Sequence, residues 1–189
     1  MKTRIVLILI IINSLISNAQ TTLKNYDCID TYLKERNIEH KKASIVIKEK
    51  DDNKGALRIF YGGDEVSHFS NNYRSPLFDE KAWEEMYRTY SNDTITKYWK
   101  PIDFPNYNFT YENRKGLWNF DFFDKYERNP MNIYIISEPM FYNQKKYVIF
   151  EFSEGITGTG GIQRNQIVIM KKNKGKWEVV ETIFDYVLH

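Results

Sequence analysis

The sequence predicts an α+β domain in which an antiparallel β-meander at the C-terminal end packs against two or three helices. Two observations support this fold class. In the last third of the chain, apolar strand-like segments are joined by short polar connections. In the first half, apolar residues recur at steps of three and four, which is typical of helices with one buried face. No internal repeat and no Pro- or Ser-rich linker divides the chain, so we expect a single domain.

The first 19 residues have the three-part layout of a secretory signal peptide. Lys2 and Arg4 give a positive start, an apolar run extends from Ile5 to Ile12, and small residues stand directly before Gln20, where we predict cleavage. The run is shorter than the roughly 20 apolar residues that a membrane-spanning helix needs. We therefore expect export to the periplasm or out of the cell, with no stable membrane anchor after cleavage. The alternative is a retained anchor or a buried N-terminal helix.

Residues 20–189 are predicted to form one globular domain, because 170 residues lie in the usual range of about 100–200 for a domain. The chain carries 27 basic and 25 acidic residues, but two of the basic ones belong to the leader, so the domain is neutral. A neutral domain is not expected to attract nucleic acid through its net charge. Cys28 is the only cysteine, which excludes an intramolecular disulfide and favours a structural thiol.

A helix and a hairpin are expected in the N-terminal part of the domain. Thr21 or Thr22 is a suitable N-cap for a helix that runs toward Asn37. Residues 43–48 are predicted to form a strand. Turn-forming residues and a second apolar segment at 57–61 follow it, and they predict a second strand and a β-hairpin.

A second helix is expected to begin after Asp79, an N-cap residue, and to end at Asn92-Asp93. Its apolar residues share one face, whereas its glutamates and Arg88 face water. Residues 117–126 fit two structures. Their composition permits a short helix, and the alternation of aromatic rings permits a strand.

Four strands are predicted in the C-terminal third, and their short connections imply an antiparallel meander. They are Asn132–Ser137, Tyr147–Phe152, Gln163–Met170 and Trp177–Phe184. The second strand is apolar throughout, so we expect both of its faces to be covered. The glycine-threonine loop at 155–161 is followed by a strand rather than a helix, which argues against a phosphate-binding loop.

The sequence contains no catalytic motif, and only three residues are candidates for acid–base chemistry. Glu151 and Glu154 lie beside the glycine-threonine loop, and His68 lies in the polar stretch before Asp79. Paired carboxylates serve acid–base chemistry where one of them is desolvated. Within a strand, however, Glu151 and Glu154 project to opposite faces. The simplest interpretation is therefore that both are charges on the surface of the sheet.

No metal site and no cofactor is predicted. His40, His68 and His189 are isolated from one another and from Cys28. The segment 51–55 lacks the alternating acidic order and the closing glutamate of a calcium loop. No serine stands in the Gly-x-Ser-x-Gly pattern of a hydrolase.

Aromatic residues are abundant, with 14 Tyr, 12 Phe and 4 Trp. Most of them fall at strand or helix spacing, which favours a core built from rings. The second interpretation is an exposed platform of rings on which a sugar or a peptide stacks.

Four short motifs follow one another from Ile136 onward. They are Ser137-Glu138-Pro139-Met140-Phe141, Lys145-Lys146-Tyr147, Gly158-Thr159-Gly160-Gly161 and Gly175-Lys176-Trp177. In this order they resemble a group of small, exported, uncharacterised bacterial proteins with an antiparallel meander. The resemblance implies export and this fold, and it implies no activity. Members of the group carry cysteines around the glycine loop, whereas this chain has Ile156, Thr157 and Thr159, so no disulfide or redox role follows.

From these observations we expect a non-enzymatic binding or interaction module. Its partner is expected to be a protein or a glycan, and not a nucleic acid. The alternative is a secreted or periplasmic hydrolase that uses dispersed acidic residues, with Glu151 and Glu154 as the named candidates.

Overall fold

The computed structural model describes residues 26–38, 42–63, 74–157 and 161–185. These residues have an α+β fold with one seven-stranded sheet. The helices are α2 (Asp27–Glu35), α3 (Asn53–Tyr61), α4 (Glu80–Tyr90), α5 (Phe120–Glu127) and the 3-10 helices η1 (Pro101–Asp103) and η2 (Arg114–Trp118). The strands are β1 (Ser44–Ile47), β2 (Phe109–Glu112), β3 (Asn132–Ile136), β4 (Met140–Tyr142), β5 (Tyr147–Ile156), β6 (Gly161–Asn173) and β7 (Lys176–Asp185).

The predicted C-terminal meander is confirmed. The strand order is β2-β1-β3-β5-β6-β7, with β4 paired to β5, and the pairs β3–β5, β5–β6 and β6–β7 are antiparallel. The first part of the sheet differs from the prediction, because β1 lies between β2 and β3 and runs parallel to both. The short strands β2 and β4 were not predicted. The sheet therefore joins a meander to a parallel part built from distant segments.

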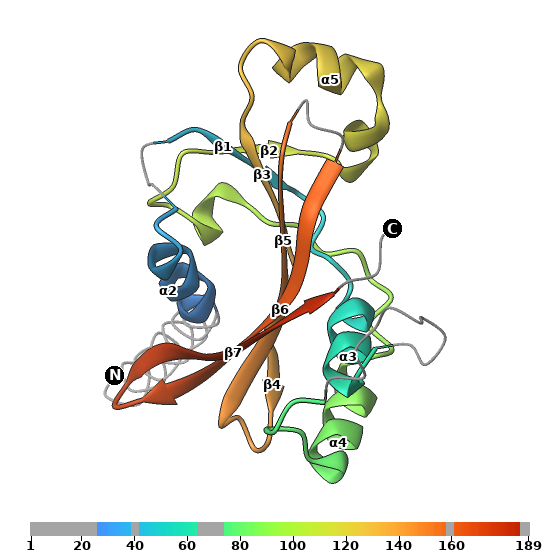
Figure 1. Cartoon of the computed structure of the whole chain (residues 1–189), viewed down its shortest axis with the longest axis vertical. Helices are drawn as coiled ribbons and strands as arrows, with labels where there is room; N and C mark the ends of the chain where they lie inside the picture. Colours follow the sequence, from blue (N-terminus) through green and yellow to red (C-terminus); the bar gives the residue numbers. More distant parts are fainter. Residues whose placement is uncertain (1–25, 39–41, 64–73, 158–160, 186–189) are drawn as a thin grey trace, which may run out of the picture.

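Strand β5 is covered on both faces, as its apolar sequence predicts. Figure 1 shows α2 on one side of the sheet and α3 with α4 on the other. Val148, Phe150 and Phe152 pack in one cluster with α2, and Ile149 packs in another with α3 and α4. A third cluster joins α5 to β1 and β3. The two faces of the sheet thus have separate cores, which share β5 as their common wall.

Helix α2 confirms the first predicted helix between Asp27 and Glu35, and residues 21–25 lie outside the described residues. Its buried face includes Tyr32, whose ring meets Phe150 and Phe152 edge-on at centroid distances of 5.6 and 5.1 Å. The amide of Gln166 donates a hydrogen bond of 2.6 Å to the Tyr32 hydroxyl. A buried phenol needs such a partner, so this bond fixes α2 against β6.

Residues 57–61 form part of helix α3, so the predicted second strand and its hairpin are wrong. The carboxylate of Asp52 accepts a hydrogen bond of 3.0 Å from the backbone N–H of Lys54, which caps the helix. Leu57 and Phe60 then fall on the buried face. A short apolar run fits both a strand and a buried helical turn, and here the cap and the packing decide between them.

Helix α4 confirms the second predicted helix, and the segment for which a helix and a strand were both possible is helical. Asp79 caps α4 by accepting a hydrogen bond of 2.9 Å from the N–H of Ala82. Segment 117–126 takes the helical alternative, as the end of η2 followed by α5. The loop expected at 155–161 is shorter, because β5 continues to Ile156 and β6 begins at Gly161. Among the described residues, no helix combines the length and apolarity needed to cross a membrane.

Candidate functional site

Of the three residues that the sequence offered for acid–base chemistry, the two that the structure describes, Glu151 and Glu154, are not brought together. His68 lies outside the described residues. Glu151 and Glu154 both belong to β5. Glu151 faces α3, where it lies against Gly55, whereas Glu154 faces the end of α2, where it meets Arg36. The alternation of side chains along a strand separates the two carboxylates by the thickness of the sheet.

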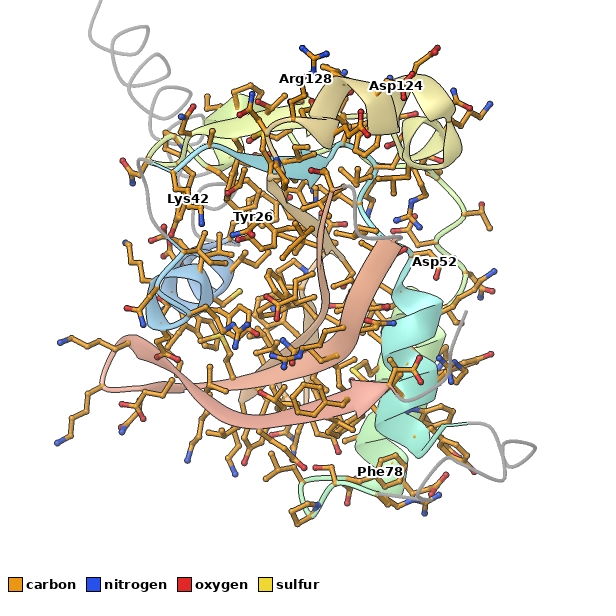
Figure 2. The ribbon with its side chains drawn as sticks, turned by 45° about the horizontal axis from the view of Figure 1, so that its top comes forward. Tyr26, Lys42, Asp52, Phe78, Asp124 and Arg128 are labelled. Atoms are coloured by element: carbon orange, nitrogen blue, oxygen red, sulfur yellow. The ribbon has the colours of Figure 1, made fainter. Side chains whose placement is uncertain are left out.

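Glu151 is buried, so its interpretation as a surface charge is wrong. Only 5% of the residue is exposed, because α3 covers this part of β5. The space for its carboxylate exists because position 55 is a glycine. A Cβ atom added at Gly55 would lie 3.2 Å from Cδ of Glu151 and even closer to Oε2. In Figure 2, Asp52 marks the end of α3 at which this contact occurs.

Burial raises the pKa of Glu151 to about 8, since the charged carboxylate loses its water. The negative charge of Asp51 raises the pKa further, and a hydrogen bond from the Asn165 side chain lowers it in part. The hydroxyl of Ser153 donates a hydrogen bond of 2.9 Å to Oδ1 of Asn165 and orients that amide. At neutral pH the Glu151 carboxyl is therefore protonated. It borders none of the three hollows described below, so these give a substrate no access to it.

Glu154 lies between two arginines on the other face of the sheet. Nη2 of Arg36 donates to both carboxylate oxygens, at 2.7 and 2.9 Å, and Nη1 of Arg164 donates to Oε1 at 3.2 Å. Arg164 is the direct partner of Glu154 across the β5–β6 pair, and Arg36 directly follows α2. Partly exposed ion pairs of this kind contribute only about 0–1 kcal/mol to stability.

Two hollows flank Glu154, and together we call them the Glu154 groove. The larger measures about 370 Å³ and the smaller about 180 Å³. Both are lined by Glu154, Asn132 and Tyr134, which form the floor between them. The larger hollow adds Gly155, Ile156 and Arg164, and the smaller adds Arg36, Asn37, Ile38, Lys42 and Ser44.

The groove has an excess of positive charge in a neutral domain. Arg36, Lys42 and Arg164 face one carboxylate, that of Glu154. A guanidinium group has five N–H donors, and Glu154 engages one nitrogen of each arginine. Burial also raises the pKa of Tyr134 at the floor, so its hydroxyl stays neutral. This arrangement is suited to hold an anionic group beside Glu154.

A third hollow of about 280 Å³ lies beside the start of α3, and ion pairs link several of its charged residues. Glu138 accepts hydrogen bonds from Lys50 at 3.1 Å and from Lys97 at 2.5 Å, and Lys97 also pairs with Asp93 at 2.6 Å. Nζ of Lys50 lies 4.1 Å from the centre of the Trp99 ring. These contacts hold the segment after α4 against the sheet and give Lys50, Lys97 and Glu138 partners within the protein.

The aromatic residues support both interpretations of their abundance. Most of the described rings lie in the cores, as Phe150 and Phe152 do. A smaller group is exposed on α3 and α4, where Trp83 stacks on Tyr87 at 5.0 Å and contacts Tyr61 at 4.7 Å. The Glu154 groove combines hollows with converging charged and polar groups, so it is the stronger candidate for a ligand site.

Cys28 is deeply buried, as expected of a structural thiol. Only 1% of it is exposed, and burial raises the pKa of its thiol to about 12, so it is not a nucleophile at neutral pH. Within the described ranges, no group of three or more His, Cys, Asp or Glu residues is placed to hold a metal ion.

Sequence reasoning missed the basic residues of the groove, which come from three separate segments. Arg36 follows α2, Lys42 precedes β1, and Arg164 lies in β6. One signal was available: the predicted hairpin around the glycine loop places Arg164 opposite Glu154. Nothing local links Arg36 or Lys42 to that pair, because only the tertiary fold brings α2 and β1 to the end of β5.

We expect Gly55→Ala to destabilise the protein by about 1–3 kcal/mol, since the added methyl group overpacks the buried Glu151 carboxyl. At an ordinary helical position the same change stabilises by up to about 1 kcal/mol. Denaturant unfolding measures the difference. Gly116→Ala is the matched control, because its Cβ would meet Phe122 at an ordinary 3.8 Å. The explanation fails if Gly55→Ala leaves the free energy of unfolding unchanged, or if adding Glu151→Ala to it restores none of the lost stability.

We expect Glu151→Gln to change how stability depends on pH. Since the folded-state pKa of about 8 exceeds the ordinary value of 4.5, folding takes up a proton between these pH values. This contribution to stability is complete below about pH 4.5 and is lost as the pH rises toward 8. Glu151→Gln has no carboxyl group to ionise at this position. Above about pH 8 its free energy of unfolding should therefore exceed that of the wild type by a few kcal/mol, about 1.4 kcal/mol for each pKa unit. Unfolding curves of both proteins at pH 5, 7 and 9 test this. A difference in stability between them that is the same at all three pH values would contradict it.

No known protein family, no curated protein and no solved structure matches this chain. The resemblance of its C-terminal motifs to small exported bacterial proteins therefore stays a prediction.

Proposed function

We propose that this chain is an exported, non-enzymatic binding domain whose partner places an anionic group in the Glu154 groove. One observation carries the proposal: Arg36 and Arg164 converge on Glu154 at the border of two adjacent hollows. The two ion pairs add little to stability, so the fold alone gives little reason for this concentration of charge. A charge-assisted hydrogen bond to a carboxylate, by contrast, is a strong and directional contact for a ligand.

The alternative of a hydrolase has no comparable support. A reaction that needs both Glu151 and Glu154 at one substrate requires them on one surface, and they lie on opposite faces of β5. Glu151 is enclosed by α3 and Glu154 is held by two arginines. Neither carboxylate is placed to exchange protons with a ligand in partnership with the other.

Export is proposed from the leader sequence. If it is correct, protein from cells that express the full chain begins at Gln20 and is found in the periplasm or the medium. N-terminal sequencing and intact mass of each cell fraction measure this. Ala19→Glu, which places a charge at the cleavage site, should leave the leader attached. Recovery of the unaltered chain from the cytosol with Met1 still present would refute export.

The binding proposal predicts that anionic probes bind through the groove. Protein purified after expression of the full chain is titrated calorimetrically with tetraglutamate, inorganic phosphate and an acidic tetrasaccharide, and with neutral tetraglutamine and maltotetraose. At least one anionic probe should bind, with an affinity that falls as salt rises. The double variant Arg36→Gln/Arg164→Gln should lose at least about tenfold in affinity.

The matched control is Arg88→Gln/Lys81→Gln, which removes the same charge from exposed positions on α4. Thermal unfolding verifies that each variant is folded. If no anionic probe binds, or if the control loses as much affinity as the groove variant, the proposed function is wrong.

A further inference from the structure

We infer that the Glu154 groove binds an acidic oligosaccharide, in which two uronic-acid units place their carboxylates in the two hollows. The inference rests on the proposed function, because it specifies the ligand of the same groove. It commits to a uronic-acid type of chain rather than to an acidic peptide.

Each of the two hollows has its own cations. Arg36 and Lys42 line the smaller hollow, and Arg164 lines the larger one. Glu154 borders both and offsets one of the three positive charges. A ligand with one carboxylate in each hollow matches the two charges that remain, whereas a single small anion matches only one of them.

Polar side chains lie between the cations of the two hollows. Asn132 and Tyr134 line both hollows, and Asn37 and Ser44 line the smaller one. Amide and hydroxyl groups both donate and accept hydrogen bonds. Sugar hydroxyls have the same double capacity, so this lining suits a chain of hydroxylated rings with charged substituents.

The larger hollow has an apolar edge. Ile156 lines it and is 38% exposed, and Phe184 is 39% exposed. The guanidinium carbon of Arg164 lies 5.5 Å from the centre of the Phe184 ring, so Arg164 connects this aromatic ring to the charged floor. The C–H face of a sugar packs on aromatic and aliphatic side chains, while its carboxylate reaches the guanidinium.

The backbone of the groove floor does not favour a peptide ligand. Extended peptides commonly gain affinity by pairing their backbone with an exposed strand edge. The floor of the groove consists of β3 and β5, and each is paired on both sides: Asn132 with Ser44 and Ile156, and Glu154 with Tyr134 and Arg164. The groove floor therefore offers side chains rather than unpaired backbone. Lys42, labelled in Figure 2, lies on the α2 side of the molecule and lines the smaller hollow.

The test is a calorimetric comparison of two uronic-acid probes, tetragalacturonate and a hyaluronan tetrasaccharide, with tetraglutamate and maltotetraose. At least one uronic-acid probe should bind at least about tenfold more tightly than tetraglutamate, and maltotetraose should bind weakest. Galacturonate monomer should bind at least about tenfold more weakly than its tetramer, because it fills one hollow only.

Single variants test the division into two hollows. Arg36→Gln and Arg164→Gln should each lower the affinity for the tetramer about tenfold, and Arg88→Gln on α4 should leave it unchanged. Phe184→Ala should lower the affinity for the acidic tetrasaccharide more than the affinity for inorganic phosphate.

The outcomes separate the two proposals. If tetraglutamate or phosphate binds as tightly as both uronic-acid probes, and the arginine variants weaken it, the groove binds anions but the oligosaccharide inference is wrong. If no anionic probe binds, both proposals are wrong. If monomer and tetramer bind equally, the ligand does not occupy two hollows.

Discussion

Burial of β5 on both faces is the constraint on which the rest of the structure depends. One face of the strand supplies Phe150 and Phe152 to the core under α2, and the other supplies Ile149 to the core under α3 and α4. A strand with two covered faces requires helices on both sides of the sheet. The positions of α2, α3 and α4 in Figure 1 follow from this requirement.

The same constraint gives two glutamates of one strand opposite chemistry. Glu151 follows Ile149 on the α3 face, where α3 encloses it and burial keeps it protonated. Glu154 lies on the α2 face near the end of β5, where the helix has ended and Arg36 follows it. Because α3 covers Glu151, its carboxyl group is part of the core. Because α2 has ended beside Glu154, the carboxylate of Glu154 lies next to the two hollows of the groove.

The Glu154 groove is thus a consequence of how the sheet ends. Strands β3 and β5 supply its floor, β6 supplies Arg164, and the segments around α2 and β1 supply Arg36 and Lys42. The parallel pairing of β1 with β3 is what brings Lys42 and Ser44 to this end. A hairpin between residues 43–48 and 57–61, as predicted from the sequence, would have placed them elsewhere.

The sequence by itself determined the C-terminal meander, the two-sided cover of β5, the cap at Asp79 and the apolar face of α2, because each depends on local periodicity and turn chemistry. It also determined that Glu151 and Glu154 point apart, since strand alternation needs no tertiary information. Only the tertiary structure decided that residues 57–61 are helical, that Glu151 is buried beneath Gly55, and that Arg36 and Lys42 meet Glu154. The physical reason is that burial and charge convergence depend on which distant segments pack together, and no local pattern records that choice.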